Sequence, residues 1–143
     1  MKPLNHVGLL EPDFSLWSDM PWAVQLYNVF RSRWCARYWQ EAGFKIIPSL
    51  KWATEPSFEF STAGLPASIP LASVQCRTTN NGKANAKFLA GLRHQLEMVK
   101  IERLMVYGGQ EHPAMFRDLP CKVALLPSWT SRRNQLRKIE STR

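Results

Sequence analysis

The stretch Pro12–Trp52, PDFSLWSDMPWAVQLYNVFRSRWCARYWQEAGFKIIPSLKW, predicts a helix set between two strands. Asp19 stands before Met20-Pro21, a pattern typical of a helix start, with Asp19 expected at the N-cap or near it and the proline in the first turn. The helix is expected over Pro21–Ala42 and to end at Gly43, because glycine readily takes the left-handed conformation that closes a helix. This segment therefore predicts a strand–helix–strand unit.

Strand and helix signals alternate along the rest of the chain. A second amphipathic segment, Ala84–Lys100, predicts another helix between short apolar runs. Pro48 is expected to end the strand Phe44–Ile47. Strands separated by helices of this length indicate an α/β fold, with a mainly parallel sheet of about five strands, crossover helices and a partial or open barrel-like shape. The expected strands are His6–Leu10, Phe44–Ile47, Ile69–Cys76, Arg103–Tyr107 and Lys122–Leu126, with a short extension at Phe58–Phe60 and a loop over Thr78–Lys83.

Length and composition favour one domain followed by a basic tail. A chain of 143 residues with 45% hydrophobic residues is long enough for one core, which we expect over residues 1–130. Residues 131–143 hold five basic residues and one acidic residue, a net +4 out of the +8 of the whole chain. Because no apolar stretch approaches about 18 residues and the N-terminus lacks a signal-peptide pattern, we expect a cytoplasmic protein without a membrane partner. Three widely spaced cysteines fit thiols of a reducing compartment: Cys35, Cys76 and Cys121.

Polar and aromatic side chains follow several of the expected strands. In a parallel sheet the loops after the carboxyl ends of the strands form the ligand-binding edge, so these side chains are expected to converge. The two aspartates of the first loop could act as general acid and base, or they could cap the helix and pair with an arginine; whether the chain is an enzyme stays open. Lys51 also follows the second strand. The residues expected in the pocket are Asp13, Ser15, Asp19, Arg33, Trp52 and Tyr107.

The apolar arc of the first helix contains an arginine. At about 100° per residue, one arc holds Trp22, Leu26, Val29, Phe30 and Trp34, and Arg33 and Arg37 fall inside it. A guanidinium that is buried or half-buried there needs a carboxylate or several carbonyls as partners. Two interpretations of Arg33 remain open. Its guanidinium could extend past the apolar side chains to solvent, or it could pair with one of the two aspartates at the base of the pocket.

Several motifs in this order and spacing resemble the phage- and mobile-element-associated family catalogued as domain of unknown function 4417, over about residues 7–109. The motifs are PDFSL (12–16), DMP (19–21), NVFRSRW (28–34), YWQ (38–40), Gly43, IIP (46–48), Trp52, SFEF (57–60), GLP (64–66) and LMVYG (104–108). The family has no assigned activity, so the resemblance implies a phage or mobile-element accessory protein and no particular chemistry. Family members carry an additional strand and helix before PDFSL, whereas eleven residues precede it here. The resemblance therefore implies a shortened, open version of a barrel-like fold, or a homo-oligomer in which another copy covers the free sheet edge.

The excess of basic residues favours a polyanionic partner, and we expect association with nucleic acid through a basic surface and the tail. Two alternatives stay open: a phage-encoded inhibitor that binds a host defence protein, and a small enzyme or ligand-binding protein that uses the strand-end pocket. The sequence contains neither a Walker loop nor the GxGxxG, GxSxG or HExxH patterns, so neither a cofactor nor a metal is expected. The residues expected to contact nucleic acid are Arg31, Arg37, Tyr38, Arg132, Arg133, Arg137 and Lys138.

Overall fold

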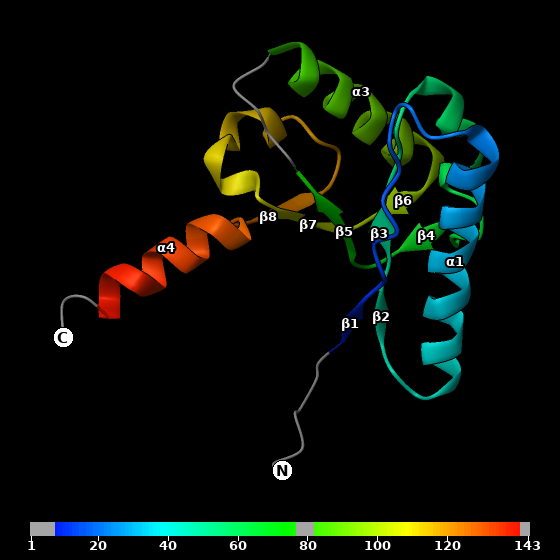
Figure 1. Cartoon of the computed structure of the whole chain (residues 1–143), viewed down its shortest axis with the longest axis horizontal. Helices are drawn as coiled ribbons and strands as arrows, with labels where there is room; N and C mark the ends of the chain where they lie inside the picture. The colour runs from blue at the N-terminus through cyan, green and yellow to red at the C-terminus, as the bar shows by residue number, and fades with distance from the viewer. Residues whose placement is uncertain (1–7, 77–81, 141–143) are drawn as a thin grey trace.

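A computed structural model describes residues 8–76 and 82–140, with side chains up to residue 137 (Figure 1). Three predicted segments reach outside these residues. They are the first two residues of the strand His6–Leu10, most of the loop Thr78–Lys83, and residues 141–143 of the basic tail.

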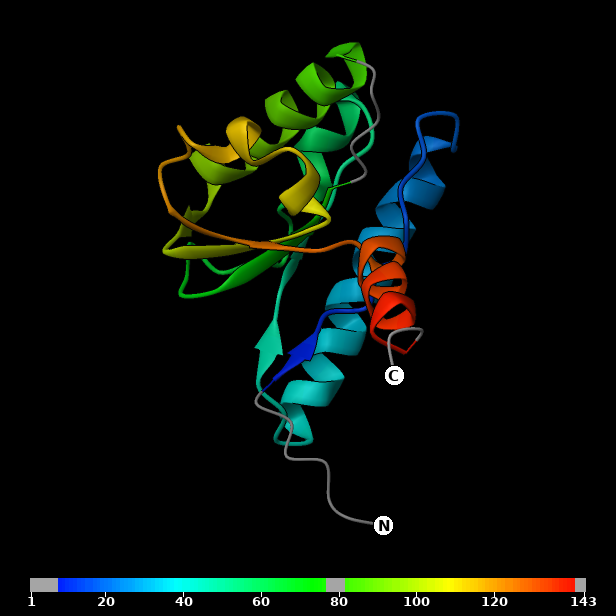
Figure 2. The ribbon, with the colours of Figure 1, turned by 90° about the vertical axis from the view of Figure 1, so that its left-hand side faces the viewer.

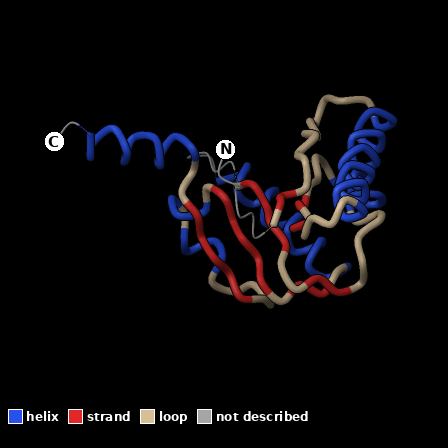
Figure 3. The backbone as a smooth tube through the Cα atoms, turned by 90° about the horizontal axis from the view of Figure 1, so that it is seen from below, coloured by secondary structure: helices blue, strands red, loops and turns tan. Residues whose placement is uncertain are grey.

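The strands lie side by side in chain order and all their pairings are parallel (Figures 1 and 3). β1 pairs with β2, β4 pairs with β6, and the central sheet has the order β3-β5-β7-β8. The strands are β1 (Leu9–Leu10), β2 (Ile46–Ile47), β3 (Ser49–Leu50), β4 (Ser68–Ile69), β5 (Ala72–Gln75), β6 (Lys100–Ile101), β7 (Arg103–Tyr107) and β8 (Lys122–Leu126).

The predicted parallel α/β fold is confirmed, and over the described residues the sheet is open and forms no closed barrel. β3 and β8 are the edge strands of the central sheet. The bounds of β7 and β8 coincide with the predicted strands. The second and third predicted strands differ from the observed ones, because the chain continues as a strand on both sides of a proline. β2 is followed by Pro48 and then β3, and β4 is followed by Pro70 and then β5. Pro48 lacks an N–H, but its carbonyl still accepts a bond from the backbone N–H of Ser73 at 2.8 Å.

Helices connect the strands and cover one face of the central sheet. The segment Phe58–Phe60 was expected as a strand extension, and this is wrong. A 3₁₀ turn with Pro56 in its first positions begins at Glu55 and leads directly into the helix, and the hydroxyl of Ser57 donates to the carbonyl of Thr54 at 2.6 Å. The helices are α1 (Trp22–Glu41), α2 (Phe58–Ser61), α3 (Gly82–Met98) and α4 (Trp129–Glu140), with 3₁₀ turns η1 (Glu55–Ser57), η2 (Gly109–Glu111) and η3 (Pro113–Phe116).

The hydrophobic core lies between α3 and one face of the central sheet. Alternate residues of the strands point to the same side, so the row Leu50, Val74, Val106 and Leu125 faces the helix. Leu92 of α3 is fully buried against this row. The other residues that belong to the core are Ile69, Ala72, Cys76, Val99, Ile101, Leu104 and Phe116.

Helix α1 lies beside β1 and β2 (Figures 1 and 2) and packs through its polar side. The apolar arc is packed only in part, because Val29 is buried whereas Trp22, Phe30 and Trp34 are exposed. The buried polar groups are bonded within the protein: the amide nitrogen of Asn28 donates to the carbonyl of Ser15 at 2.9 Å, and the hydroxyl of Ser32 donates to the carbonyl of Asn28 at 3.1 Å. Such bonds replace those to water and make the burial of polar groups tolerable. The buried residues of α1 are Gln25, Asn28, Val29 and Ser32.

The two ends of α1 test two sequence predictions. Gly43 has a φ of +88° directly after the C-cap Ala42, so its predicted role in closing the helix is confirmed. Asp19 does not cap the helix. The N-cap position belongs to Pro21, while Asp19 lies exposed in the preceding turn.

Candidate functional site

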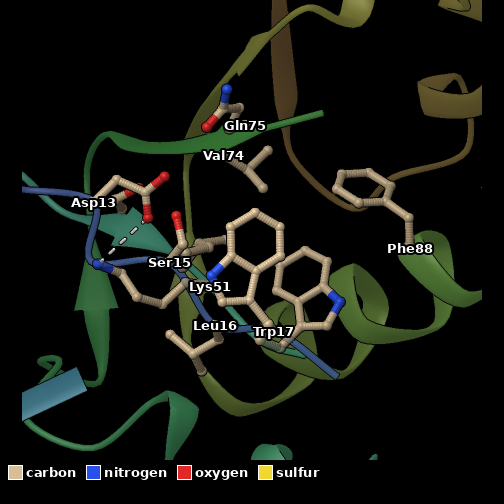
Figure 4. Close-up of a pocket in the computed structure, with 11 residues that line it drawn as sticks. Asp13, Ser15, Leu16, Trp17, Lys51, Val74, Gln75 and Phe88 are labelled. Carbon is tan, nitrogen blue, oxygen red and sulfur yellow. Dashed lines mark ion pairs between the residues drawn. The ribbon is translucent and has the colours of Figure 1, made fainter. Parts of the chain in front are cut away.

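A cavity of about 190 Å³ opens at the carboxyl ends of the first three strands of the sheet (Figure 4). Its wall combines the loop after β1, the end of β3, the end of β5 and one residue of α3. This is the edge at which parallel sheets bind ligands. The residues that line it are Asp13, Ser15, Leu16, Trp17, Ser49, Leu50, Lys51, Trp52, Val74, Gln75 and Phe88.

Three of the six residues expected in the pocket line this cavity: Asp13, Ser15 and Trp52. The other three lie elsewhere. Asp19 is exposed in the turn before α1, and Tyr107 lies on β7, in register with Gln75 but outside the cavity wall. The third, Arg33, forms a separate cluster.

Arg33 pairs with Glu11, so neither predicted interpretation of this arginine holds. Its guanidinium binds both carboxylate oxygens of Glu11 and donates to the carbonyls of Ser61 and Ala63, each at 3.1 Å. The backbone N–H of Ser49 donates to the same carboxylate at 2.8 Å. The side chains of Glu11 and Arg33 are only 1% and 13% exposed. This buried pair joins the first loop to α1, β3 and the residues after α2, and it lies outside the cavity.

Lys51 is the buried cation of the cavity wall. Its ammonium donates to the carbonyl of Pro12 at 3.0 Å and to the hydroxyl of Ser32 at 2.5 Å, and it lies 3.9 Å from a carboxylate oxygen of Asp13 (Figure 4). Burial lowers the pKa of Lys51, while the charges of Glu11 and Asp13 act in the opposite direction. The sequence placed Lys51 after the second strand, but no local signal showed that its amine would be buried.

The apolar side of the cavity is built by aromatic residues from two elements. The ring of Trp52 lies 5.3 Å from that of Phe88, which comes from α3 on the side opposite Asp13 and Lys51 (Figure 4). Trp52 can approach the helix because residue 91 is glycine: a Cβ atom on Gly91 would lie 2.0 Å from the indole nitrogen. The cavity thus offers a carboxylate and an amine beside an apolar wall, an arrangement suited to a small ligand with one polar end.

A second surface lies on the exposed side of α1 and is called here the aromatic line: Tyr27, Phe30, Trp34 and Tyr38. These side chains are 56–60% exposed. Of the basic residues predicted nearby, Arg31 is half-buried over the ring of Phe14 at 4.0 Å, and Arg37 is exposed and pairs with Glu41 at 2.9 Å. The aromatic line therefore exposes aromatic rings, and the two arginines beside it, Arg31 and Arg37, already interact with other residues of the protein.

Helix α4 carries most of the predicted basic residues and projects from the end of β8 (Figures 1 and 3). The carboxylate of Glu111 accepts bonds from the hydroxyls of Ser128 at 2.8 Å and Ser131 at 2.6 Å, and these bonds, Ser131 first, lower the pKa of Glu111. Ser128 also accepts the backbone N–H of Ser131 at 3.2 Å, as an N-cap does. Exposed on this helix are Arg132, Arg133 and Arg137; Lys138 belongs to it as well, but its side chain lies outside the described ones.

Within the described residues, no group of three or more histidine, cysteine, aspartate or glutamate side chains is arranged to hold a metal ion. None of the described helices is both long enough and apolar enough to cross a membrane. All three cysteines carry thiols.

The chain matches the family model described as domain of unknown function (DUF4417) over residues 2–126. It is similar to the Gene 1 protein of Mycobacterium phage L5, with 38% identity over 133 residues, which are 92% of this chain and 57% of that protein. It is also similar to the Gene 1 protein of Mycobacterium phage D29, with 42% identity over 101 residues, 69% of this chain and 37% of that protein. The chain thus spans little more than half of one relative and less than half of the other. No solved structure matches it.

Proposed function

This chain belongs to the family described as domain of unknown function DUF4417, and on that premise we propose that it is a phage accessory protein that binds single-stranded nucleic acid through the aromatic line of α1. It is a phage-encoded protein, as its similarity to the two Gene 1 proteins indicates. The observation that carries the proposal is that four large aromatic side chains lie exposed in one line on a helix that packs through its polar side.

The geometry of the aromatic line suits stacking on bases. Trp34 and Tyr38 lie with ring centres 5.8 Å apart and planes only 8° from parallel, and Tyr27 and Phe30 lie 6.2 Å apart with planes at 23°. Exposed parallel rings are the platforms on which single strands stack, at about 1–3 kcal/mol per base. Leaving such rings in water without a partner is unfavourable, because each exposes apolar surface that binding would bury.

The charge for the phosphates comes mainly from α4, since Arg31 and Arg37 already have partners. Arg132, Arg133 and Arg137 are exposed on a helix that projects from the sheet (Figure 3). A helix of 12 residues has marginal stability by itself in water, so a polyanion that neutralises these charges would also stabilise the helix. α1 and α4 lie on opposite sides in Figures 1 and 3, and we assign them separate parts: stacking to α1 and electrostatic attraction to α4.

Two variants test the two parts separately, with a labelled single-stranded oligonucleotide as probe. Phe30→Ala with Trp34→Ala should weaken binding by at least about tenfold and leave the salt dependence unchanged, because stacking is lost and no charge is removed. Replacing the three arginines of α4 by glutamine should weaken binding and flatten the salt dependence.

Each variant has a matched control. Phe44→Ala is the control for the first variant, since Phe44 is exposed outside the aromatic line. The control for the second variant replaces three exposed basic residues outside α4 by glutamine: Lys100, Arg117 and Lys122. Binding that survives loss of Phe30 and Trp34 unchanged would refute the proposal.

The composition of the aromatic line also favours a second candidate, a host protein as the partner. Tryptophan, tyrosine and arginine dominate the residues that contribute most to protein interfaces. Capture from host lysate before and after nuclease treatment separates the two candidates. A partner that persists after nuclease and is lost with Phe30→Ala and Trp34→Ala supports the protein partner, whereas capture that depends on nucleic acid supports the first proposal.

A further inference from the structure

The amine of Lys51 stands out among the lysines of the chain. Every other lysine with a described side chain is exposed, whereas that of Lys51 is 5% exposed and lines the strand-end cavity. Burial of a charged amine is costly unless it is well paired, and the nearest carboxylate, that of Asp13, lies 3.9 Å away and is itself 43% exposed. This arrangement is poor for a structural ion pair and well suited to a group that exchanges a proton.

We propose that Lys51 is a nucleophilic amine that forms an imine with a small neutral aldehyde or ketone bound in the strand-end cavity, with Asp13 as the proton acceptor. The proposal is independent of nucleic-acid binding, because it uses different residues.

The hydrogen bonds of Lys51 leave one position on its nitrogen available. An ammonium group has three N–H donors, and two of them go to the carbonyl of Pro12 and the hydroxyl of Ser32. The third N–H donor makes no hydrogen bond within the described residues, and the carboxylate of Asp13 lies 3.9 Å from the nitrogen. When the proton of this third position is lost, both structural hydrogen bonds remain in the neutral amine, and the lone pair left there is the one that attacks the ligand. The protonated imine keeps one N–H, so one of the two hydrogen bonds is given up when the carbon–nitrogen double bond forms.

Burial and local charge decide which ligand can reach this amine. Burial disfavours the ammonium form and lowers the pKa of Lys51, so more neutral amine is present than on an exposed lysine at the same pH. The cavity of about 190 Å³ is smaller than the ~300–1,000 Å³ of sites for drug-sized molecules, which favours a small ligand. The carboxylate of Asp13 repels an anion, and the rings of Trp52 and Phe88 favour an apolar carbon chain. A short, uncharged carbonyl compound meets all three conditions.

The reaction balances with the groups present and water. Asp13 accepts one proton from the Lys51 ammonium, and the nitrogen lone pair then bonds to the carbonyl carbon. One proton on the nitrogen then passes to the former carbonyl oxygen, which gives a neutral carbinolamine. Its hydroxyl group leaves as water with the proton returned by Asp13, and the product is a protonated imine that carries one N–H and the positive charge of the original ammonium. A carbon–nitrogen double bond replaces the carbon–oxygen double bond, one water is released, and nothing is oxidised or reduced.

Reductive trapping on the wild-type protein tests the proposal without any risk of unfolding a variant. The protein is incubated near pH 7 with propanal and sodium cyanoborohydride, which delivers hydride to the imine, and the alkylated lysines are mapped by peptide mass spectrometry. Lys45, Lys100 and Lys122 are internal controls, because their side chains are exposed whereas that of Lys51 is buried. Lys51 should be alkylated at least about tenfold faster than these three, although it is the least exposed.

Two further measurements complete the test. For the pH profile the trap is sodium borohydride, because cyanoborohydride reduces only the protonated imine and becomes slow at alkaline pH. The rate for Lys51 should reach its plateau at a lower pH than the rates for the exposed lysines. On that plateau, where the amine of Lys51 is neutral in both proteins, Asp13→Asn should slow the trapping of Lys51 and leave the three control lysines unchanged. Alkylation of Lys51 no faster than that of the exposed lysines would overturn the proposal, and an unchanged plateau rate in the Asp13→Asn protein would overturn the part given to Asp13.

Discussion

The pairs Glu11–Arg33 and Asp13–Lys51 begin only two residues apart in the sequence, but their surroundings are opposite. The carboxylate of Glu11 is almost inaccessible and is bound by the guanidinium of Arg33 and the backbone of Ser49. The carboxylate of Asp13 is half-exposed and stands 3.9 Å from a buried amine in a cavity wall. The first pair has its hydrogen-bonding capacity occupied and therefore holds the fold together. The second pair keeps hydrogen-bonding positions of Lys51 and Asp13 without a partner among the described residues, in the wall of a cavity where a ligand can use them.

The largest effect is expected from breaking the buried pair. Arg33→Met leaves the Glu11 carboxylate charged, buried and without its partner, and such a change typically costs about 3–5 kcal/mol of folding stability. Urea unfolding with an unchanged slope measures the loss.

Two controls accompany this variant. The double variant Glu11→Leu with Arg33→Met should recover a large part of the loss, because no charge is then left buried. Arg37→Met breaks an exposed pair with Glu41 and should cost no more than about 0.5 kcal/mol. If Arg33→Met costs as little as Arg37→Met, the Glu11–Arg33 pair does not hold the fold together.

An intermediate effect is expected from disturbing the wall behind Lys51. In Gly91→Ala the new Cβ atom would overlap the indole of Trp52, so the ring must move, and overpacking of this kind costs about 1–3 kcal/mol. The same change should alter the trapping of Lys51 and spare the Glu11–Arg33 pair, which lies outside the cavity. Gly82→Ala in the same helix is the matched control, because a Cβ there meets no atom of the described residues within 4 Å. Equal effects of the two substitutions would mean that Trp52 does not depend on Gly91.

The third effect is a dependence of stability on pH that belongs to Lys51 alone. Its pKa is lower in the folded protein than the ordinary value of 10.5, so between the two values the unfolded chain holds the extra proton. Stability therefore rises as pH increases through that window, with a slope of at most about 1.4 kcal/mol per pH unit for one proton. Urea midpoints measured from neutral to alkaline pH should show this rise in the wild type and a flatter profile in Lys51→Met. Parallel profiles would show that the ammonium of Lys51 is as stable in the folded protein as in water.

The smallest effect on stability is expected from the exposed end of the second pair. Asp13→Asn removes a half-exposed carboxylate at 3.9 Å from its partner, a pair worth about 0.2–1 kcal/mol. Because the charge of Asp13 raises the pKa of Lys51, the same variant should lower that pKa further, which the pH profile of trapping measures. A loss of stability as large as that of Arg33→Met would make the two pairs equivalent and remove the contrast between them.

Much of the fold could be predicted from the sequence because its signals are local. The segments Arg103–Tyr107 and Lys122–Leu126 are short apolar runs with clear ends, and the structure forms strands over the same residues. Gly43 closes α1 because a positive φ is easy only for glycine. The parallel order of the strands followed from the helices between them. At Pro48 the local rule that proline ends a strand did not hold, because the chain continues as β3 directly after it.

The candidate site was only partly within reach of the sequence. Asp13, Ser15 and Trp52 were expected together because each follows a strand, and all three line one cavity. Lys51 and Gly91 were missed as parts of the site, since a buried amine and a close helix approach have no sequence signal over a few residues. The partner of Arg33 was missed, because neither of the two open interpretations named Glu11 and spacing alone does not distinguish three carboxylates that lie close together in the sequence.

By itself the sequence determined the class of fold, the positions of most strands and helices, and the family to which the chain belongs. Only the tertiary structure decided that α1 packs through its polar side, that Glu11 and not Asp13 binds Arg33, and that the amine of Lys51 is buried in a cavity wall. The physical reason is the sequence separation between the residues that interact. Turns, caps and strands depend on neighbours within a few residues, whereas burial and ion pairing depend on groups such as Glu11 and Arg33, 22 residues apart, which meet only when the sheet takes its register.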